Sequence, residues 1–168
     1  MSGEPLTWSA LPRPLRVLAR WLTIVQVVGY TTSLLFVWYT TQMVPRGIAE
    51  RYRGSDPAAS DAAMNFPKSF AEMLTITHTH LLSMAAIFAL SGAILALCRR
   101  PSEWWRTGLI IEPFIALLTS FTAMWLMRYL DPRFSWLLAL SSGSMAVVFY
   151  LQAWWILREL GWREKREI

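Results

Sequence analysis

Four long stretches of the chain are dominated by apolar residues and are separated by short polar segments. They cover about residues 21–44, 72–98, 107–130 and 134–157. Each is long enough to cross the hydrocarbon of a bilayer, roughly 30 Å thick, as a helix that rises about 1.5 Å per residue. The remaining segments are too short to bury a core of their own. The pattern therefore predicts an all-α membrane protein, in which residues 1–168 form a single domain with four transmembrane helices in an antiparallel bundle.

The second span begins with a helix-capping signal. Ser69 and Glu72 have the S-x-x-E spacing of a capping box, in which two side chains satisfy free backbone N–H groups at a helix start. The segment from Leu81 to Leu97 is apolar or small, and arginines follow it. The whole helix would be roughly 43 Å long, so its first two turns are expected to stand in the headgroup layer.

The longest connection between spans is the loop 45–68, which we expect on the external side. Its segment GIAERYRG, residues 47–54, is typical of a short surface helix. We expect the loop to cover the external end of the bundle, and a docking surface for a partner is the alternative.

Polar and small residues recur in the first span with alternating steps of three and four. This seam consists of Thr23, Gln26, Tyr30, Ser33, Val37 and Thr40. Transmembrane helices often pack through such residues, because lipid offers no hydrophobic contrast. The seam is therefore expected to face protein.

The formal net charge of +5 does not indicate a nucleic-acid partner, because the basic residues lie beside the span ends. Arginine and lysine at such positions orient a membrane protein. Of the 16 Lys and Arg residues, ten lie on the side of the two termini and six on the other side. This bias predicts both termini in the cytoplasm, with the protein in a bacterial inner membrane.

Tryptophan and tyrosine are placed near the predicted span ends. The chain is 14% aromatic and has ten tryptophans, among them the pairs 104–105 and 154–155. Such residues prefer the membrane interface. The single cysteine, Cys98, excludes an internal disulfide.

One candidate polar layer lies about one turn from the cytoplasmic span ends. It combines Gln26, Ser91, Glu112 and Gln152. A carboxyl group inside a membrane is costly unless it is paired, hydrogen-bonded or protonated. The layer is therefore a candidate for proton transfer or for binding a quinone headgroup. The alternative is a set of hydrogen bonds that only fixes helix packing.

A second candidate site lies at the external end of the second span, where His78 and His80 are the only histidines of the chain. They point about 200° apart on a helix, so they cannot bind one ion together. In one interpretation, a histidine is an axial ligand of haem b, with a methionine or a second subunit opposite. In another, His80 forms a soft metal site for Cu(I) with Met73 and Met84. In the third, neither histidine binds a cofactor.

Arg128 lies on the same external side as the histidines. Its guanidinium is a candidate for binding a haem propionate or a lipid phosphate. The simpler interpretation is a solvated residue beside a span end.

These features favour a small integral membrane subunit of a respiratory or photosynthetic electron-transfer complex, with a haem or quinone contact on the external side. The alternatives are a structural or assembly subunit without a cofactor, and a metal-handling or transport protein. The expected partners are the lipid bilayer and other membrane subunits or a second copy of the chain. No nucleophile–base pair or carboxylate pair is apparent, so an autonomous enzyme is not expected.

Overall fold

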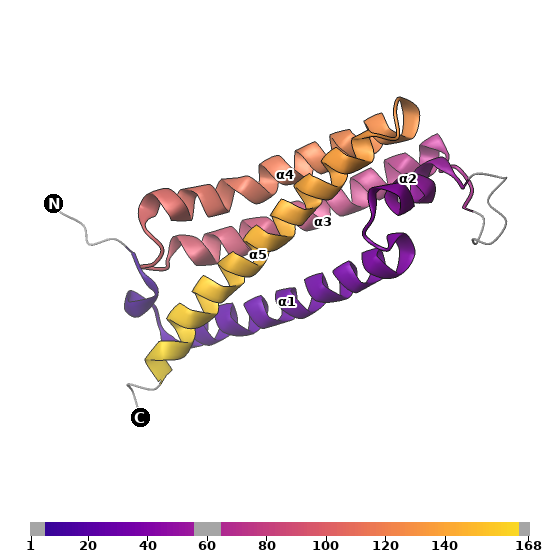
Figure 1. Cartoon of the computed structure of the whole chain (residues 1–168). Helices are drawn as coiled ribbons and strands as arrows, with labels where there is room; N and C mark the ends of the chain where they lie inside the picture. Colours follow the sequence, from indigo (N-terminus) through magenta and orange to yellow (C-terminus); the bar gives the residue numbers. More distant parts are fainter. Residues whose placement is uncertain (1–5, 56–64, 165–168) are drawn as a thin grey trace.

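The computed structural model describes residues 6–55 and 65–164. Within these residues it contains helices and no strand, and four helices are long and apolar enough to cross a membrane. This confirms the predicted all-α bundle of four membrane-spanning helices. The elements are η1 (Trp8–Ala10), α1 (Arg13–Thr41), α2 (Pro45–Arg53), α3 (Phe70–Ala96), α4 (Glu103–Tyr129) and α5 (Phe134–Glu164), shown in Figure 1.

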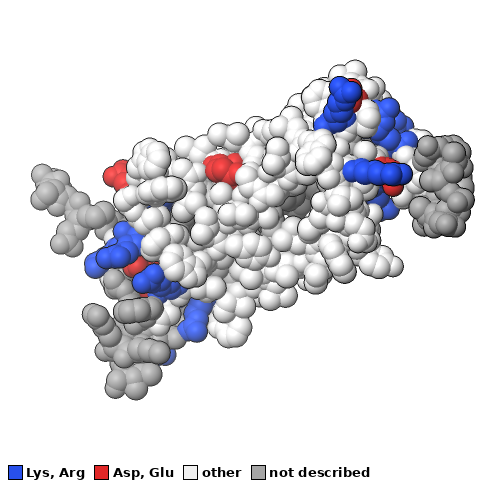
Figure 2. Space-filling model, in the orientation of Figure 1, with Lys and Arg blue, Asp and Glu red and all other residues white. Residues whose placement is uncertain are grey.

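The long helices alternate in direction, so the start of α1 and the end of α5 lie at the same end of the bundle (Figure 1). We call this the terminal end, and the opposite end, where α2 lies, the α2 end. Lysine and arginine collect at both ends, with a largely uncharged band between them (Figure 2). This distribution is typical of a protein whose ends lie in the two headgroup layers. The compartment that each end faces stays a prediction.

Helices α3, α4 and α5 form the well-packed part of the bundle. Phe88, Leu117 and Phe149, one from each helix, are almost fully buried where the three meet. Small residues let the helices approach closely, and the buried hydroxyls of Ser120 and Ser141 are 2.7 Å apart between α4 and α5. Such contacts are the usual means of helix association in lipid.

Helix α1 packs against the bundle mainly through its terminal-end half. Thr23 and Tyr30 are buried, and the ring of Tyr30 stacks on Phe149 at 4.4 Å. The predicted protein-facing seam is therefore right in this half. Ser33 and Val37 are exposed, so no other described helix of this chain covers that part of the seam. A serine does not need a protein partner here, because the Ser33 hydroxyl donates to the carbonyl of Gly29 in its own helix.

Helix α2 covers the end of the bundle, as expected for part of the loop 45–68. Ile48 is buried in a cluster with Met73 of α3 and Met124 and Met127 of α4. Arg53 donates from Nη1 to the carbonyl oxygen of Met127 at 2.8 Å. That carbonyl is near the end of α4 and has no donor within the helix, so α2 also caps α4.

The segment before α1 is fixed across the terminal end by Trp8, which the sequence analysis did not predict. The indole Nε1 of Trp8 donates to the carbonyl of Ile94 at 2.9 Å, and its backbone N–H donates to Leu97 at 3.2 Å. Its side chain is buried beside Cys98 and Leu160. The last carbonyls of a helix need outside donors, so Trp8 completes the end of α3.

Candidate functional site

Helix α3 starts where the capping signal predicts. The Glu72 backbone N–H donates to Oγ of Ser69 at 3.2 Å, and the Ser69 N–H donates to Oε2 of Glu72 at 2.8 Å. This confirms the capping box. The helix then continues without a break to Ala96. The depth expected for His78 and His80 can therefore be counted along the helix from residues whose depth is expected from other features.

Tryptophans on neighbouring helices predict the depth of the histidines in the membrane. Trp21 and Trp38 of α1, and Trp104 and Trp125 of α4, are separated by roughly 25–32 Å of helix, close to the hydrocarbon thickness. Trp125 donates from Nε1 to Oγ1 of Thr77 at 2.9 Å. Thr77 is therefore expected at the aromatic belt of the α2 end. The next turn of α3, with both histidines, is expected up to roughly 5 Å further into the hydrocarbon.

Both histidines are exposed on the surface of the bundle rather than directed into it. His78 makes no hydrogen bond within the described residues. Nδ1 of His80 is 3.0 Å from the carbonyl oxygen of Ile76. A carbonyl only accepts hydrogen bonds, so this contact places the proton of the neutral ring on Nδ1 and the lone pair on Nε2. Proteins commonly orient a metal-binding histidine in this way.

The structure does not bring the two candidate methionines together with His80. Met73 is fully buried in the cluster beneath α2, and Met84 is half-buried beside the aromatic core. Met73 lies seven residues before His80 and Met84 four residues after it on the same helix, so neither can bind the opposite face of a haem held by His80. Across residues 6–55 and 65–164, no group of three or more His, Cys, Asp or Glu residues could hold a metal ion.

Two members of the predicted polar layer meet in the core. Gln152 is fully buried, and its Oε1 accepts a hydrogen bond from Oγ of Ser91 at 2.7 Å. Its Nε2 donates to the carbonyl of Leu109 at 2.6 Å. Pro113 has no N–H and so cannot donate to Leu109, four residues earlier in α4. Gln152 replaces that donor and ties α3, α4 and α5 together.

The other two members keep unpartnered oxygens. Gln26 donates from Nε2 to the carbonyl of Ile87 at 3.4 Å. Its Oε1 and the Oε2 of Glu112 are buried and have no hydrogen-bond partner within the described residues. Glu112 lies roughly 11 Å along α4 from the Trp104–Trp105 pair, well inside the membrane. Its carboxyl group is close enough to the Tyr30 phenol to interact with it electrostatically.

Arg128 is engaged in the structure of the α2 end. Its Nε donates to the carbonyl of Lys68 at 2.8 Å, and its guanidinium lies 5.0 Å from the centre of the Tyr129 ring. These contacts hold the segment that leads into α3. They are the contacts of a packing residue, and nothing in them requires a propionate or a phosphate.

Comparison with known proteins agrees with the membrane fold. Residues 42–167 match the family model Aq_1264_TM, which is described as a transmembrane helical domain. The match covers α2, α3, α4 and α5, whereas α1 lies outside it. No curated protein and no solved structure matches the chain. The chain is therefore an integral membrane protein in contact with lipid, and it belongs to the Aq_1264_TM family of transmembrane helical domains.

Proposed function

We propose that this protein is an integral subunit of a respiratory or photosynthetic electron-transfer complex, and that His80 binds a cofactor where the protein meets another subunit. A b-type haem is the favoured cofactor, since imidazole is a normal axial ligand of haem iron. The supporting observation is the contact of His80 Nδ1 with the Ile76 carbonyl, which leaves the Nε2 lone pair on the exposed side of the ring.

The membrane environment strengthens this assignment. A polar ring exposed to hydrocarbon is costly unless it finds a partner, and such residues usually mark functional sites. Because α3 supplies the only histidines, the second axial ligand of a haem would come from another subunit or a second copy. The hydroxyl of a quinol, which donates a hydrogen bond to Nε2, is the alternative ligand.

The test is an absorption spectrum of the full chain, purified in mild detergent together with the proteins that accompany it. We expect a Soret band that His80→Ala removes. His78→Ala is the matched control, because that ring makes no hydrogen bond in the described structure, and the band should persist. A complex without haem or quinone, or a spectrum unchanged by His80→Ala, would overturn the proposal.

A structural or assembly subunit without a cofactor is the second candidate. It is supported by Gln152, Ser91 and Arg128, whose polar groups bond to other parts of the chain. On this proposal, His80→Ala would leave both the spectrum and the composition of the purified complex unchanged.

We also propose that the terminal end faces the cytoplasm of a bacterium and that the α2 end lies outside the inner membrane. The excess of Lys and Arg on the side of the termini supports this orientation. Labelling of a cysteine at position 133 (Arg133→Cys) by an impermeant maleimide in intact cells, in a Cys98→Ser background, is the test. Labelling only after cell lysis would indicate the opposite orientation, with the α2 end in the cytoplasm.

A further inference from the structure

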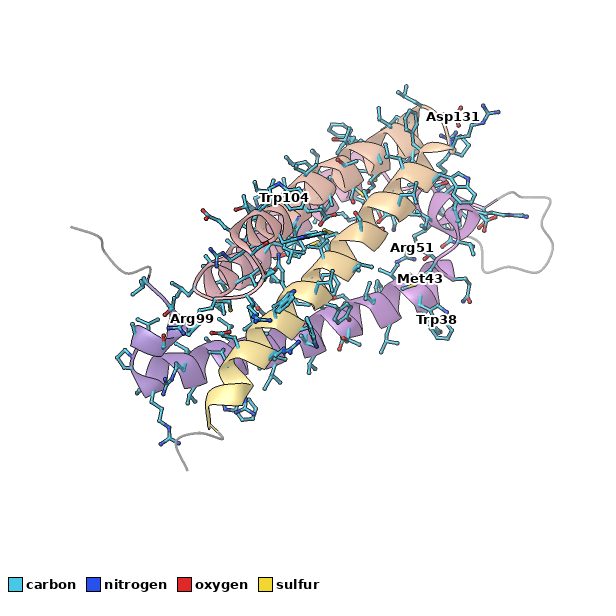
Figure 3. The ribbon with its side chains drawn as sticks, turned by 60° about the vertical axis from the view of Figure 1, so that its left-hand side comes forward. Trp38, Met43, Arg51, Arg99, Trp104 and Asp131 are labelled. Atoms are coloured by element: carbon cyan, nitrogen blue, oxygen red, sulfur yellow. The ribbon has the colours of Figure 1, made fainter. Side chains whose placement is uncertain are left out.

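Glu112 is the one acidic residue that lies inside the spans and away from their ends. No lysine or arginine, and no Asp or Glu other than Glu112, occurs at residues 21–45, 73–98, 107–127 and 134–157. In Figure 3, Trp104 and Asp131 mark the two ends of α4, and Glu112 lies in the helix between them. It is roughly 12 Å along the helix from Trp104 and roughly 20 Å from Trp125. We therefore expect its carboxyl group inside the hydrocarbon, with no basic residue at its depth.

The hydrogen-bond donors of the same polar layer are used elsewhere. The side-chain amides of Gln26 and Gln152 donate to backbone carbonyls, and the hydroxyl of Ser91 donates to Gln152. None of these donors bonds to Glu112, and its buried Oε2 has no hydrogen-bond partner within the described residues. A carboxylate in nonpolar surroundings is stabilised by a cation or by several donated hydrogen bonds. The described part of the chain offers neither, which leaves the uncharged acid as the form that suits this position.

The Glu112 side chain lies at the edge of the bundle rather than in its centre. Its Oε2 is covered by protein, but the residue as a whole is only half-buried. Figure 2 shows acidic surface within the largely uncharged band between the two ends. On the inner side, the Tyr30 phenol interacts with the carboxyl group electrostatically. The part of the side chain that stays at the surface faces lipid, so a lipid-soluble molecule can reach it and a water-soluble one cannot.

We propose that Glu112 is a proton-binding site inside the membrane. In the lipid-embedded bundle its carboxyl group holds a proton, which it can exchange only with groups that reach it through the protein or through the lipid. The neutral acid has one O–H group, which can be donated to a lipid-soluble acceptor. This site lies on α4, whereas His80 lies on α3, and it does not depend on the function proposed for His80.

Reaction with N,N′-dicyclohexylcarbodiimide tests the site, with the full chain in phospholipid vesicles at neutral pH. This reagent dissolves in the bilayer and requires the proton of the acid. The proton moves to a nitrogen of the carbodiimide, and the carboxyl oxygen forms a bond to its central carbon. The product rearranges to a stable N-acylurea, so a whole reagent molecule is added and nothing leaves. Intact-mass spectrometry should show one added molecule per chain, and sequencing of the α4 peptide should place it on Glu112.

Two variants and a second reagent serve as controls. Glu112→Gln should abolish the labelling, and it should fold, because the amide has nearly the same shape as the acid. Glu103→Gln, at the exposed start of α4, should leave the labelling unchanged. A water-soluble carbodiimide should not label Glu112. The proposal fails if the wild type is not labelled, if Glu112→Gln is labelled to the same extent, or if the water-soluble reagent labels Glu112 equally well.

Infrared spectroscopy of the same vesicles observes the proton without a reagent. A protonated carboxyl group has a C=O stretching band that is separate from the bands of a carboxylate. This band should be present in the wild type and in Glu103→Gln, and it should be absent from Glu112→Gln. A carboxylate band that disappears in Glu112→Gln would show instead that Glu112 is ionised, and this would overturn the proposal.

Discussion

The side-chain amide of Gln152 donates to the carbonyl oxygen of Leu109 at 2.6 Å. Pro113 makes this bond necessary, because it removes the N–H that would otherwise satisfy Leu109 within α4. Pro113 by itself would weaken α4, but the carbonyl that it leaves without a donor is the one to which α5 binds.

Gln152→Leu is expected to lower the free energy of unfolding by about 1–3 kcal/mol, because it leaves the Leu109 carbonyl without a donor in a nonpolar core. In a Pro113→Ala background the loss should be smaller, since the new N–H of residue 113 can donate to Leu109. Unfolding in mixed micelles with increasing SDS measures both values. Equal losses in the two backgrounds would show that the bond to Leu109 contributes nothing specific.

Trp8→Ala is expected to destabilise the protein by about 3 kcal/mol or more, because it empties a buried site and removes the donor to Ile94. Trp104→Ala is the control. That side chain is 76% exposed, so the effect should stay within about 0.5 kcal/mol. The same unfolding assay applies. Similar effects of the two substitutions would contradict a structural role for the segment before α1.

The Cys98 thiol is expected to resist alkylation by iodoacetamide at pH 8. Burial, with a smaller contribution from the charge of Glu159, raises its pKa to about 12, so almost no reactive thiolate forms. Trp8→Ala should expose the thiol and speed the reaction, which mass spectrometry can follow. Rapid labelling of the folded wild type would rule out the burial of Cys98 beneath Trp8.

The same pKa shift makes stability depend on pH. The folded protein favours the neutral thiol, so this contribution is complete below the ordinary thiol pKa of 9.0. It is then lost as the pH rises toward 12. Cys98→Ser should reduce the decline in the free energy of unfolding over this range, and an identical decline in both proteins would contradict the assignment.

Glu112→Leu is expected to raise the free energy of unfolding by about 1 kcal/mol, because it replaces a buried oxygen that has no partner in the described residues. Retention of such a residue is typical of a functional site inside a membrane. Glu103→Leu, at the exposed start of α4, serves as the control in the same assay. A clear loss of stability in Glu112→Leu would identify the carboxyl group as a packing element instead.

The sequence was most informative where one local rule determines the structure. The capping box at Ser69, the four spans and the short helix over the connection all follow from spacing and hydropathy. The polar layer was predicted from the depth of its residues in the spans. The partner of Gln152 is a backbone carbonyl. To identify it, one must know both that Pro113 leaves this carbonyl free and how α4 is aligned against α5. The position of Trp8 depends on contacts with the end of α3, far away in the sequence.

The seam on α1 shows that the periodicity of small and polar residues cannot distinguish the lipid-facing side of a membrane helix from the protein-facing side. Lipid and protein are similarly apolar, so a stripe of small and hydroxyl residues fits either surface. Ser33 satisfies its hydroxyl within its own helix, and the pattern alone cannot show that α1 diverges there. The depth of the histidines at the boundary of the hydrocarbon stays a prediction. The exposure of the histidines and the contact of His80 with Ile76 could be seen only in the folded structure.

The attachment of Trp8 to Ile94 sets an order of events during synthesis. The two residues are 86 positions apart, and ribosomes add roughly 5–20 residues per second, so roughly 4–17 s separate their appearance. The first helix must therefore enter the bilayer before its anchoring site exists. The anchor can close only after the chain has crossed the membrane a second time.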